Sequence, residues 1–562
     1  MANRFHALLK PHSIFSPPRQ LAIILYSLLL AIVTTTWGSR LWLLTIREFD
    51  QDEFVHFHDA WCISKGLRPY CDFWEHHVPL LHLLFAPCVR FFNVTESLSE
   101  AIELFFLGRG IMWVFLAGIL VATAWLGSLW RNRLVGAVGT VFLVNTEIFL
   151  DETLEFRPDV PSTFFWLSCL VAVVRGLQLE DERNPRSRVY FLVSGLLLGA
   201  GVMTTQKLLV GLPGFAVAAL LYFLRAPDRA SLRTKLMNTG FLLAGVLLPV
   251  LSMMMYFYFQ NCLWNFIHSN FLFALKFKAK RLPHRDLVAL LIQNPYLMLF
   301  GGIGLFGFLL ALVRRLPLQT EDCLLFPCGI GFIAGMWLIP APFAHYYLTF
   351  LPLLSLFAAD SLIRIFEKLS SMRATAALKK WTLSVAQVSV PALVLVGVVC
   401  RPHVAAFWFG ALMIAVLVLY FRAPALALAV FLLVITVPPQ FRTKASLKLR
   451  NSQQFEQIRY VLEHTKPNET VMDGFSGVGV FRPHAYFYYM LDWSVALMLP
   501  DAEWNALLRQ LQTREISPKL VILDRELQQI PRPIVDFFRE NYEPAGVGAI
   551  WKRKEYGPAQ PR

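Results

Sequence analysis

The sequence predicts an all-α polytopic membrane protein with about 13 transmembrane helices, followed by a small external α/β domain. Two observations lead to this fold class. The 562-residue chain is 56% hydrophobic and only 16% charged, whereas a soluble protein carries about 25% charged residues. Its apolar residues also form blocks of roughly 18–25, the length that crosses a ~30 Å hydrocarbon core at ~1.5 Å per residue.

The N-terminus predicts an anchor that is retained. Residues 1–20 are basic, and we expect them to lie in the cytoplasm. The apolar run that follows ends without a small-residue cleavage site, which indicates a signal-anchor and not a cleaved signal peptide. Residues 21–438 then form the transmembrane domain, with spans at about 21–46, 103–126, 134–150, 160–178, 190–206, 208–224, 237–258, 295–313, 323–340, 344–363, 381–400, 404–421 and 423–438.

The basic residues predict the orientation of these spans. If the N-terminus is cytoplasmic, every loop expected on that side carries Arg or Lys, as the positive-inside rule requires. Arg131 and Arg133 follow the second span, and Arg364 and Lys368 follow the tenth. An odd number of spans then places the first loop (47–100) and the C-terminal domain (439–562) on the external side.

One external segment departs from that rule. Residues 270–286 carry the cations Lys276, Lys278, Lys280, Arg281 and Arg285. An anionic head group would explain them, and so would a solvated amphipathic helix. The cytoplasmic loops account for most of the net charge of +14, so the charge gives no reason to expect nucleic-acid binding.

The composition changes after residue 438. "QFEQIRYVLEHT", "AEWNALLRQLQ" and "RPIVDFFREN" have the spacing of amphipathic helices, whereas "ETVMDGF" and "PKLVILD" are typical of short buried strands. These elements predict the α/β domain. Its "GFSGVGVFRP" lacks the GxGxxG spacing of a dinucleotide site, which favours a tight loop.

The first loop concentrates titratable side chains in an otherwise apolar chain: Asp50, Asp52, Glu53, Asp59, Asp72 and Glu75, with His56, His58, His76, His77 and His82. Such a loop can simply face water, or it can form the floor of an active site. A carboxylate among other acids can have its pKa raised into the range of a general base. Cys62 and Cys71 share this loop and could pair if it faces an oxidising compartment.

Two further sets of ionisable residues lie at the same external side. "DETLEFRPDVPS" after the third span contains Arg157 and Asp159, and Lys207 stands alone after the fifth span. Charged residues at helix ends can merely extend toward water. Three sets on one side nevertheless suggest a shared cavity, and Arg109 within the second span supports this, because intramembrane charges usually line a functional interior.

The order of these motifs resembles a known family. The "DE" pair, "G..PY.DF.E.H.PL", "RPD", the lone Lys and "HYYLTFLPLLSLFAA" resemble the GT-C superfamily of membrane glycosyltransferases, in particular the groups similar to dolichyl-phosphate-mannose-protein mannosyltransferase and aminoarabinose lipid A transferase. The resemblance covers residues 20–365. It implies a hexosyl- or pentosyltransferase that inverts the anomeric carbon. We expect it in a bacterial inner membrane, because the sequence has no signal for retention in the endoplasmic reticulum. Its donor would be a polyprenyl-phosphate sugar, and its acceptor a lipid, glycan or protein on the external (periplasmic) face.

The resemblance also implies roles for individual residues. Asp52 would be the catalytic base, with Glu53 beside it, and Asp159 would be a second catalytic acid. The substrate-binding residues would be Arg157, Lys207, His56, His77, Lys276, Lys278, Lys280, Arg281, His345 and Tyr346. Where the family often has Lys-Pro-Pro, this chain has His77, so a permanent positive charge at that position is in doubt.

No cofactor is expected, although the five histidines and the acids of the first loop could instead bind a divalent metal. One rival function also stays open. The first loop has neither HxxxH nor HExxH, and the cysteines lack zinc-type spacing, so a divalent metal has little support from the sequence. A transporter or flippase of an anionic lipid-linked substrate would also use external cations. Such proteins typically have interrupted helices and charges near the mid-plane, whereas these ionisable groups gather at the external ends of the spans.

Overall fold

The computed structural model describes residues 19–226, 228–273, 282–339, 342–371, 427–428, 431–432 and 451–554. Within these ranges, seven helices are long and apolar enough to cross a membrane, and three shorter apolar helices accompany them. The chain is therefore a multi-pass membrane protein, as the sequence predicts.

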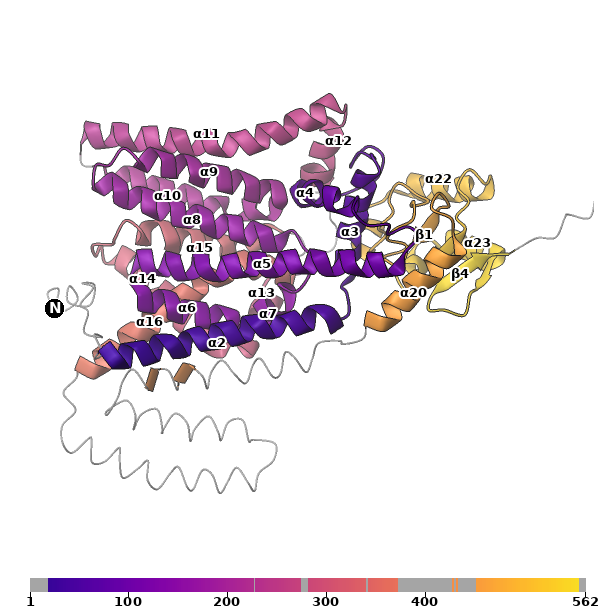
Figure 1. Ribbon diagram of the computed structural model, residues 1–562. Helices are drawn as coiled ribbons and strands as arrows, with labels where there is room; N and C mark the ends of the chain where they lie inside the picture. Colours follow the sequence, from indigo (N-terminus) through magenta and orange to yellow (C-terminus); the bar gives the residue numbers. More distant parts are fainter. Residues whose placement is uncertain are drawn as a thin grey trace, which may run out of the picture.

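Most of the helices run side by side as a bundle (Figure 1). Their bounds are α2 (Arg19–Ile46), α5 (Leu98–Trp130), α6 (Arg133–Val144), α7 (Glu147–Glu152), α8 (Asp159–Asp181), α9 (Ser187–Thr204), η1 (Gln206–Gly211), α10 (Leu212–Leu224), α11 (Arg229–Phe259), α12 (Leu263–Ile267), η2 (His268–Leu272), α13 (His284–Gln293), α14 (Pro295–Val313), α15 (Asp322–Gly335), η4 (Met336–Leu338), η5 (Ala344–Thr349) and α16 (Leu351–Ser371).

Each of the ten predicted spans before residue 370 contains a helix. The span predicted at 134–150 is divided, because α6 ends at Val144 and α7 begins at Glu147. The spans predicted after residue 380 lie almost wholly outside the described residues, so the total of 13 remains a prediction.

Small residues bring two neighbouring helices of the bundle close together. Gly195 of α9 lies against α11, and a Cβ added to it would stand 2.0 Å from the Leu242 carbonyl oxygen. Gly245 of α11 lies equally close to the Leu192 carbonyl, where its Cβ would stand at 2.3 Å. This close backbone contact is the kind that stabilises helix pairs in membranes, where burial from water contributes little.

The first loop and the C-terminal domain lie together at one end of the bundle (Figure 1). The loop contains α3 (Gln51–Ser64) and α4 (Leu80–Val89). The sequence did not predict α4, because its ten residues are fewer than a membrane span requires.

The C-terminal domain has the expected α/β character. It contains α20 (Asn451–His464), β1 (Val471–Asp473), α21 (Trp493–Ala496), α22 (Asp501–Gln512), β2 (Leu520–Ile522), η7 (Leu527–Gln529), α23 (Arg532–Asn541), β3 (Tyr542–Pro544) and β4 (Ile550–Arg553). The sheet has the order β1-β2-β4-β3, with β1 parallel to β2 and the other pairs antiparallel. The sequence predicted β1 and β2 but not β3 and β4.

The glycine-rich loop after β1 attaches this domain to α3. Gly477 has φ +74°, and a Cβ there would stand 2.3 Å from the Cβ of Phe54. Only glycine combines this backbone conformation with such a close approach. Gln454 of α20 adds a second attachment, because its amide bonds both the N–H and the carbonyl of Phe49 at 2.8 Å. The domain is thus fixed against the start of the first loop.

The pairing considered for Cys62 and Cys71 is wrong. Cys71 forms a disulfide with Cys262, 191 residues away, and Cys62 is a free, buried thiol in α3. The disulfide joins the first loop to the turn between α11 and α12. Sequence separation alone gave no sign of this pairing.

We expect this disulfide to hold proteolytic fragments together. Cleavage between residues 71 and 262 should give fragments that migrate as one species without reductant and separate with it. Cys71→Ser and Cys262→Ser should abolish the link, whereas Cys88→Ser, at a free cysteine, should retain it. Fragments that stay linked in Cys71→Ser would contradict the assignment.

Candidate active site

The start of α3 places the two acids of the "DE" pair in different surroundings. Asp50 caps the helix by accepting from the Asp52 N–H at 3.0 Å, and the Glu53 carboxylate accepts from the Asp50 N–H at 3.0 Å. This capping box fixes the first turn. Successive residues of a helix point about 100° apart, so Glu53 can point into the protein while Asp52 does not.

Glu53 is fully buried and forms an ion pair with Arg109, at 2.6 Å. Its other oxygen accepts from the Arg109 Nε at 2.9 Å and from the Phe156 N–H at 2.9 Å. Both oxygens of Glu53 are therefore bound to protein groups. The sequence suggested a catalytic place for this acid, but the structure gives it the contacts of a residue that holds α3 in position.

Arg109, the partner of Glu53, makes further contacts that hold the start of α3. Its guanidinium donates to the carbonyls of Leu44, Arg47 and Glu48, and it lies 3.5 Å from the centre of the Phe49 ring. The sequence suggested that Arg109 lines a functional interior. It instead binds the connection between α2 and α3 and is fully buried.

Asp52 remains accessible, with a side chain that is 34% exposed. Its Oδ2 accepts from Arg157 at 2.7 Å, and its Oδ1 has no hydrogen-bond partner among the described residues. Desolvation raises the pKa of Asp52 to about 6, because it outweighs the Arg157 charge, and the nearby Asp50 carboxylate raises it further. Asp52 thus combines an open oxygen with a basicity suited to proton transfer near neutral pH.

Arg157 is surrounded by acceptors. Its Nη2 bonds Asp50 at 2.8 Å as well as Asp52, its Nη1 lies 2.7 Å from the His345 Nδ1, and its Nε pairs with Glu155. All three guanidinium nitrogens thus face protein groups. The sequence proposed Arg157 as a substrate ligand, but its contacts are those of a residue that holds Asp52.

Glu152 lies beside this cluster, 3.4 Å from Arg157 and 3.9 Å from His345. Burial raises the pKa of Glu152 to about 7. The side chain belongs to the "DETLEFRPDVPS" set that the sequence places on the external side near a shared cavity, but no role was predicted for it. The signal was its place in this acidic segment, five residues before Arg157.

Lys207 forms a second centre of positive charge. Its Nζ lies 3.1 Å from Asp159 and 4.2 Å from the centre of the Tyr346 ring. The Lys207 charge also lowers the pKa of Asp52, so the two groups lie within electrostatic reach. The Lys207 side chain is 15% exposed and has a single carboxylate partner among the described residues, which leaves it better suited than Arg157 to receive an anion.

Histidines of the first loop lie near the charged side chains of Arg157 and Lys207. His77 Nδ1 donates to Glu75 at 2.7 Å, and the His56 Nδ1 lies 3.0 Å from the His82 Nε2. Burial lowers the pKa of His77 to about 3 and that of His56 well below its usual range. His77 is therefore neutral near pH 7 and does not replace the positive charge of the family lysine.

The structure brings most of the predicted residues into one region: Asp52, Arg157, Asp159, Lys207, His56, His77, His345 and Tyr346. Lys276, Lys278, Lys280 and Arg281 lie outside the described residues. Asp492 of the C-terminal domain also lies close enough to raise the pKa of Asp52. No sequence signal identified Asp492, because it stands in a segment without a recognisable motif.

Comparison with known proteins supports the fold. No protein-family model and no curated protein matches the sequence. Among solved structures, the chain is similar to apo ArnT from Cupriavidus metallidurans (TM-score 0.57, 12% identity, 94% of this chain and 96% of that one). It is also similar to ArnT bound to undecaprenyl phosphate (TM-score 0.54, 12% identity, 89% and 96%).

A third similar structure is the archaeal oligosaccharyltransferase AglB from Archaeoglobus fulgidus, in complex with an inhibitory peptide and a dolichol-phosphate (TM-score 0.51, 11% identity, 89% of this chain and 68% of that one). ArnT and AglB belong to the GT-C superfamily. The similarity covers most of the chain and shows that it has the GT-C fold, as its motifs predict.

Proposed function

We propose that this protein is a membrane glycosyltransferase that transfers a sugar from a polyprenyl-phosphate donor to a hydroxyl-bearing acceptor. One observation carries the proposal: an accessible acid of raised pKa, Asp52, lies within electrostatic reach of a cation, Lys207. It is supported by the fold, because similar structures are membrane glycosyltransferases and two of them contain a polyprenyl or dolichol phosphate.

The reaction requires a base and a site for the leaving phosphate. The Asp52 carboxylate would remove the proton of the acceptor hydroxyl as its oxygen attacks the anomeric carbon. The bond from that carbon to the phosphate oxygen then breaks, and the phosphate leaves with the electron pair. Lys207 would stabilise the negative charge on the phosphate. Attack from the side opposite to the phosphate inverts the anomeric carbon.

The surrounding residues would keep this pair in place. Arg157 holds one oxygen of Asp52 and leaves the other open, while the Glu53–Arg109 pair fixes the turn that carries Asp52. We therefore assign Glu53 to positioning. Asp159 would orient Lys207, and it is the alternative base if Asp52 is not the base.

We place this site on the external side of a bacterial inner membrane. The basic loops at the other ends of the helices favour that orientation. The Cys71–Cys262 disulfide ties the first loop, which also carries Asp52, to the turn before α12, and disulfides persist in oxidising compartments.

Removal of the Lys207 charge should weaken use of the donor. A lost contact to an ionised group costs about 1.5–3 kcal/mol, so Lys207→Met should lower kcat/KM for a polyprenyl-phosphate sugar by about 10–100-fold. Lys207→Arg should restore part of the loss. Lys65→Ala, at an exposed lysine at the end of α3, is the control. Unchanged donor kinetics in folded Lys207→Met would exclude Lys207 as the phosphate ligand.

Transfer should fall as pH falls through about 6, because Asp52 acts only in its ionised form. Asp50→Asn should move this acid limb to lower pH, since the Asp50 charge raises the pKa of Asp52. Asparagine also caps helices well, so α3 should stay intact. The measurement is kcat/KM against pH for both proteins and for Asp72→Asn, a charge-neutralising control in the same loop. A limb that moves to higher pH in Asp50→Asn would contradict the assignment.

A further inference from the structure

Three potential metal ligands meet where α3 contacts the C-terminal domain. His58 and Cys62 are four residues apart on α3, and such residues share one helix face. His484 reaches them from the segment after β1. The His58 Nε2 lies 3.0 Å from the His484 Nδ1, and the Cys62 Sγ lies 3.4 Å from the first nitrogen and 4.0 Å from the second.

The outward nitrogen of His58 is already occupied. The His58 Nδ1 donates to the Val480 carbonyl at 2.7 Å. A neutral imidazole has one N–H. With its N–H on Nδ1, His58 presents the lone pair of Nε2 toward His484 and Cys62. A cation between the three side chains would accept that lone pair.

The same contacts are typical of histidines that bind metals. Such histidines usually donate their second ring nitrogen to a backbone carbonyl or carboxylate, which sets the tautomer and the orientation of the ring. Here the Val480 carbonyl of the C-terminal domain gives this support to His58 of the first loop.

The spacing of the three atoms suits a tetrahedral ion. Zinc bonds of about 2.0–2.1 Å to nitrogen and about 2.3 Å to sulfur place two nitrogens about 3.3 Å apart and a nitrogen and a sulfur about 3.6 Å apart. The three distances lie within about half an ångström of these values. Shifts of that size are available to side chains without movement of either backbone.

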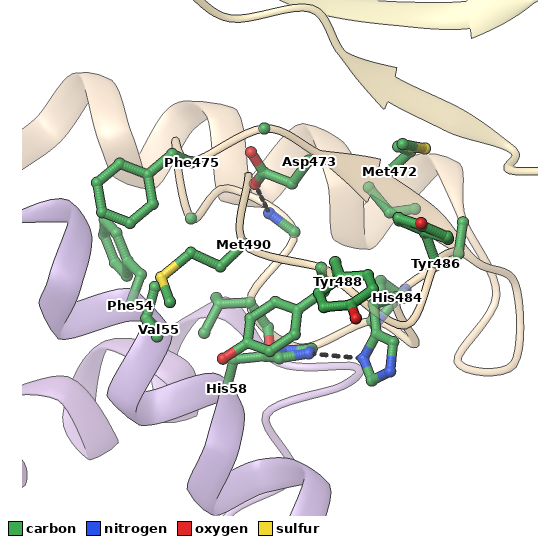
Figure 2. A pocket seen from close by; sticks show the side chains of 18 residues that line it. Phe54, Val55, His58, Met472, Asp473, Phe475, His484, Tyr486, Tyr488 and Met490 are labelled. Carbon is green, nitrogen blue, oxygen red and sulfur yellow. Dashed lines mark hydrogen bonds between the residues drawn. The ribbon is translucent and has the colours of Figure 1, made fainter. Parts of the chain in front are cut away.

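We propose that His58, Cys62 and His484 bind a zinc-class divalent cation that ties α3 to the C-terminal domain. Cys62 would bind as the thiolate, and its proton would leave to solvent when the metal enters. The fourth coordination position would face the small cavity that His58 and His484 line together with Asp473 and Tyr488. Figure 2 shows both rings at this cavity, with their facing nitrogens joined by a dashed line.

This site differs from the proposed catalytic centre in position and ligands. Asp52 lies at the start of α3, whereas His58 and Cys62 lie in its second half. The cation would fix the end of α3 to the domain that also supplies Asp492, and so hold the two walls of the catalytic region together. It would take no part in the proton transfer proposed for Asp52.

The test is the metal content and spectrum of the purified full-length protein. After exposure to micromolar Zn²⁺ and desalting, we expect about one tightly bound equivalent of zinc by elemental analysis. Co²⁺ in its place should give the visible bands of a tetrahedral ion and a near-ultraviolet thiolate-to-metal band. Since Cys62 is the only cysteine in this ligand set, the thiolate band should vanish in Cys62→Ser.

Matched variants make the result specific. His484→Ala should lose the bound zinc and lower the midpoint of thermal unfolding, and chelation of wild-type protein should lower it similarly. Cys88→Ser and His464→Ala, at a cysteine outside the site and an exposed histidine of α20, should bind zinc like the wild type. Absence of a thiolate band in folded, Co²⁺-treated wild type, or its persistence in Cys62→Ser, would overturn the proposal whatever the stability of His484→Ala.

Discussion

Replacement of Asp52 by asparagine should lower sugar transfer by about 10²–10⁴-fold, the usual contribution of a positioned general base. Asparagine keeps the size of the side chain and can still accept from Arg157, but it cannot take the acceptor proton. The fold should survive, because Asp52 is partly exposed and belongs to no apolar core. The measurement is transfer of labelled sugar from a polyprenyl-phosphate donor in membranes that contain equal amounts of each protein.

Two comparison variants test whether the loss of transfer is specific to Asp52. Asp72→Asn removes an acid from the same loop, but that acid pairs with exposed Arg68, so its activity should match the wild type. Asp159→Asn should impair the orientation of Lys207 and reduce transfer less than Asp52→Asn. Near-normal transfer in Asp52→Asn together with loss in Asp159→Asn would move the base to Asp159, and full activity in both would sink the mechanism.

Rupture of the Glu53–Arg109 pair should have the largest effect on stability. Both side chains are fully buried, and removal of one partner leaves an uncompensated charge, which typically costs about 3–5 kcal/mol. Glu53→Ala and Arg109→Ala should each lower the midpoint of thermal unfolding of the detergent-purified protein and lower its yield in membranes.

A double variant distinguishes the effect of the lost ion pair from the effect of the lost side-chain volume. Glu53→Gln with Arg109→Met removes both charges and keeps much of the volume, so it should be more stable than either alanine variant. Asp72→Asn, which breaks an exposed pair, should unfold like the wild type. If Glu53→Ala unfolds at the wild-type temperature, Glu53 does not anchor α3, and a direct catalytic role for it must be considered again.

The parts of the fold that depend on local pattern followed from the sequence. Span length predicted the bundle helices, and helical spacing predicted α22 and α23, because both signals are contained in a short window. The strands β3 (Tyr542–Pro544) and β4 (Ile550–Arg553) were missed because their mixed polar composition does not have the pattern of a buried strand. The disulfide of Cys71 with Cys262 was missed because no local pattern links residues so far apart.

The sequence predicted which residues lie together in the site, but not the separate role of each residue. The family motifs identified Asp52, Asp159 and Lys207, which the structure brings into one region. Glu53 and Asp52 are adjacent in sequence, and their difference depends on Arg109, which comes from another helix. Likewise, the His58, Cys62 and His484 cluster includes a ligand 422 residues away, so ligand spacing within the first loop could not reveal it.

The most direct test of the central claim is an experimental structure of the protein with a polyprenyl phosphate. We predict phosphate density within hydrogen-bond distance of the Lys207 Nζ, with the open Oδ1 of Asp52 facing the position of the sugar. The lipid chain should leave the site toward the bilayer. A phosphate bound elsewhere, or a head group near the mid-plane between broken helices as a transporter or flippase would hold it, would contradict the account.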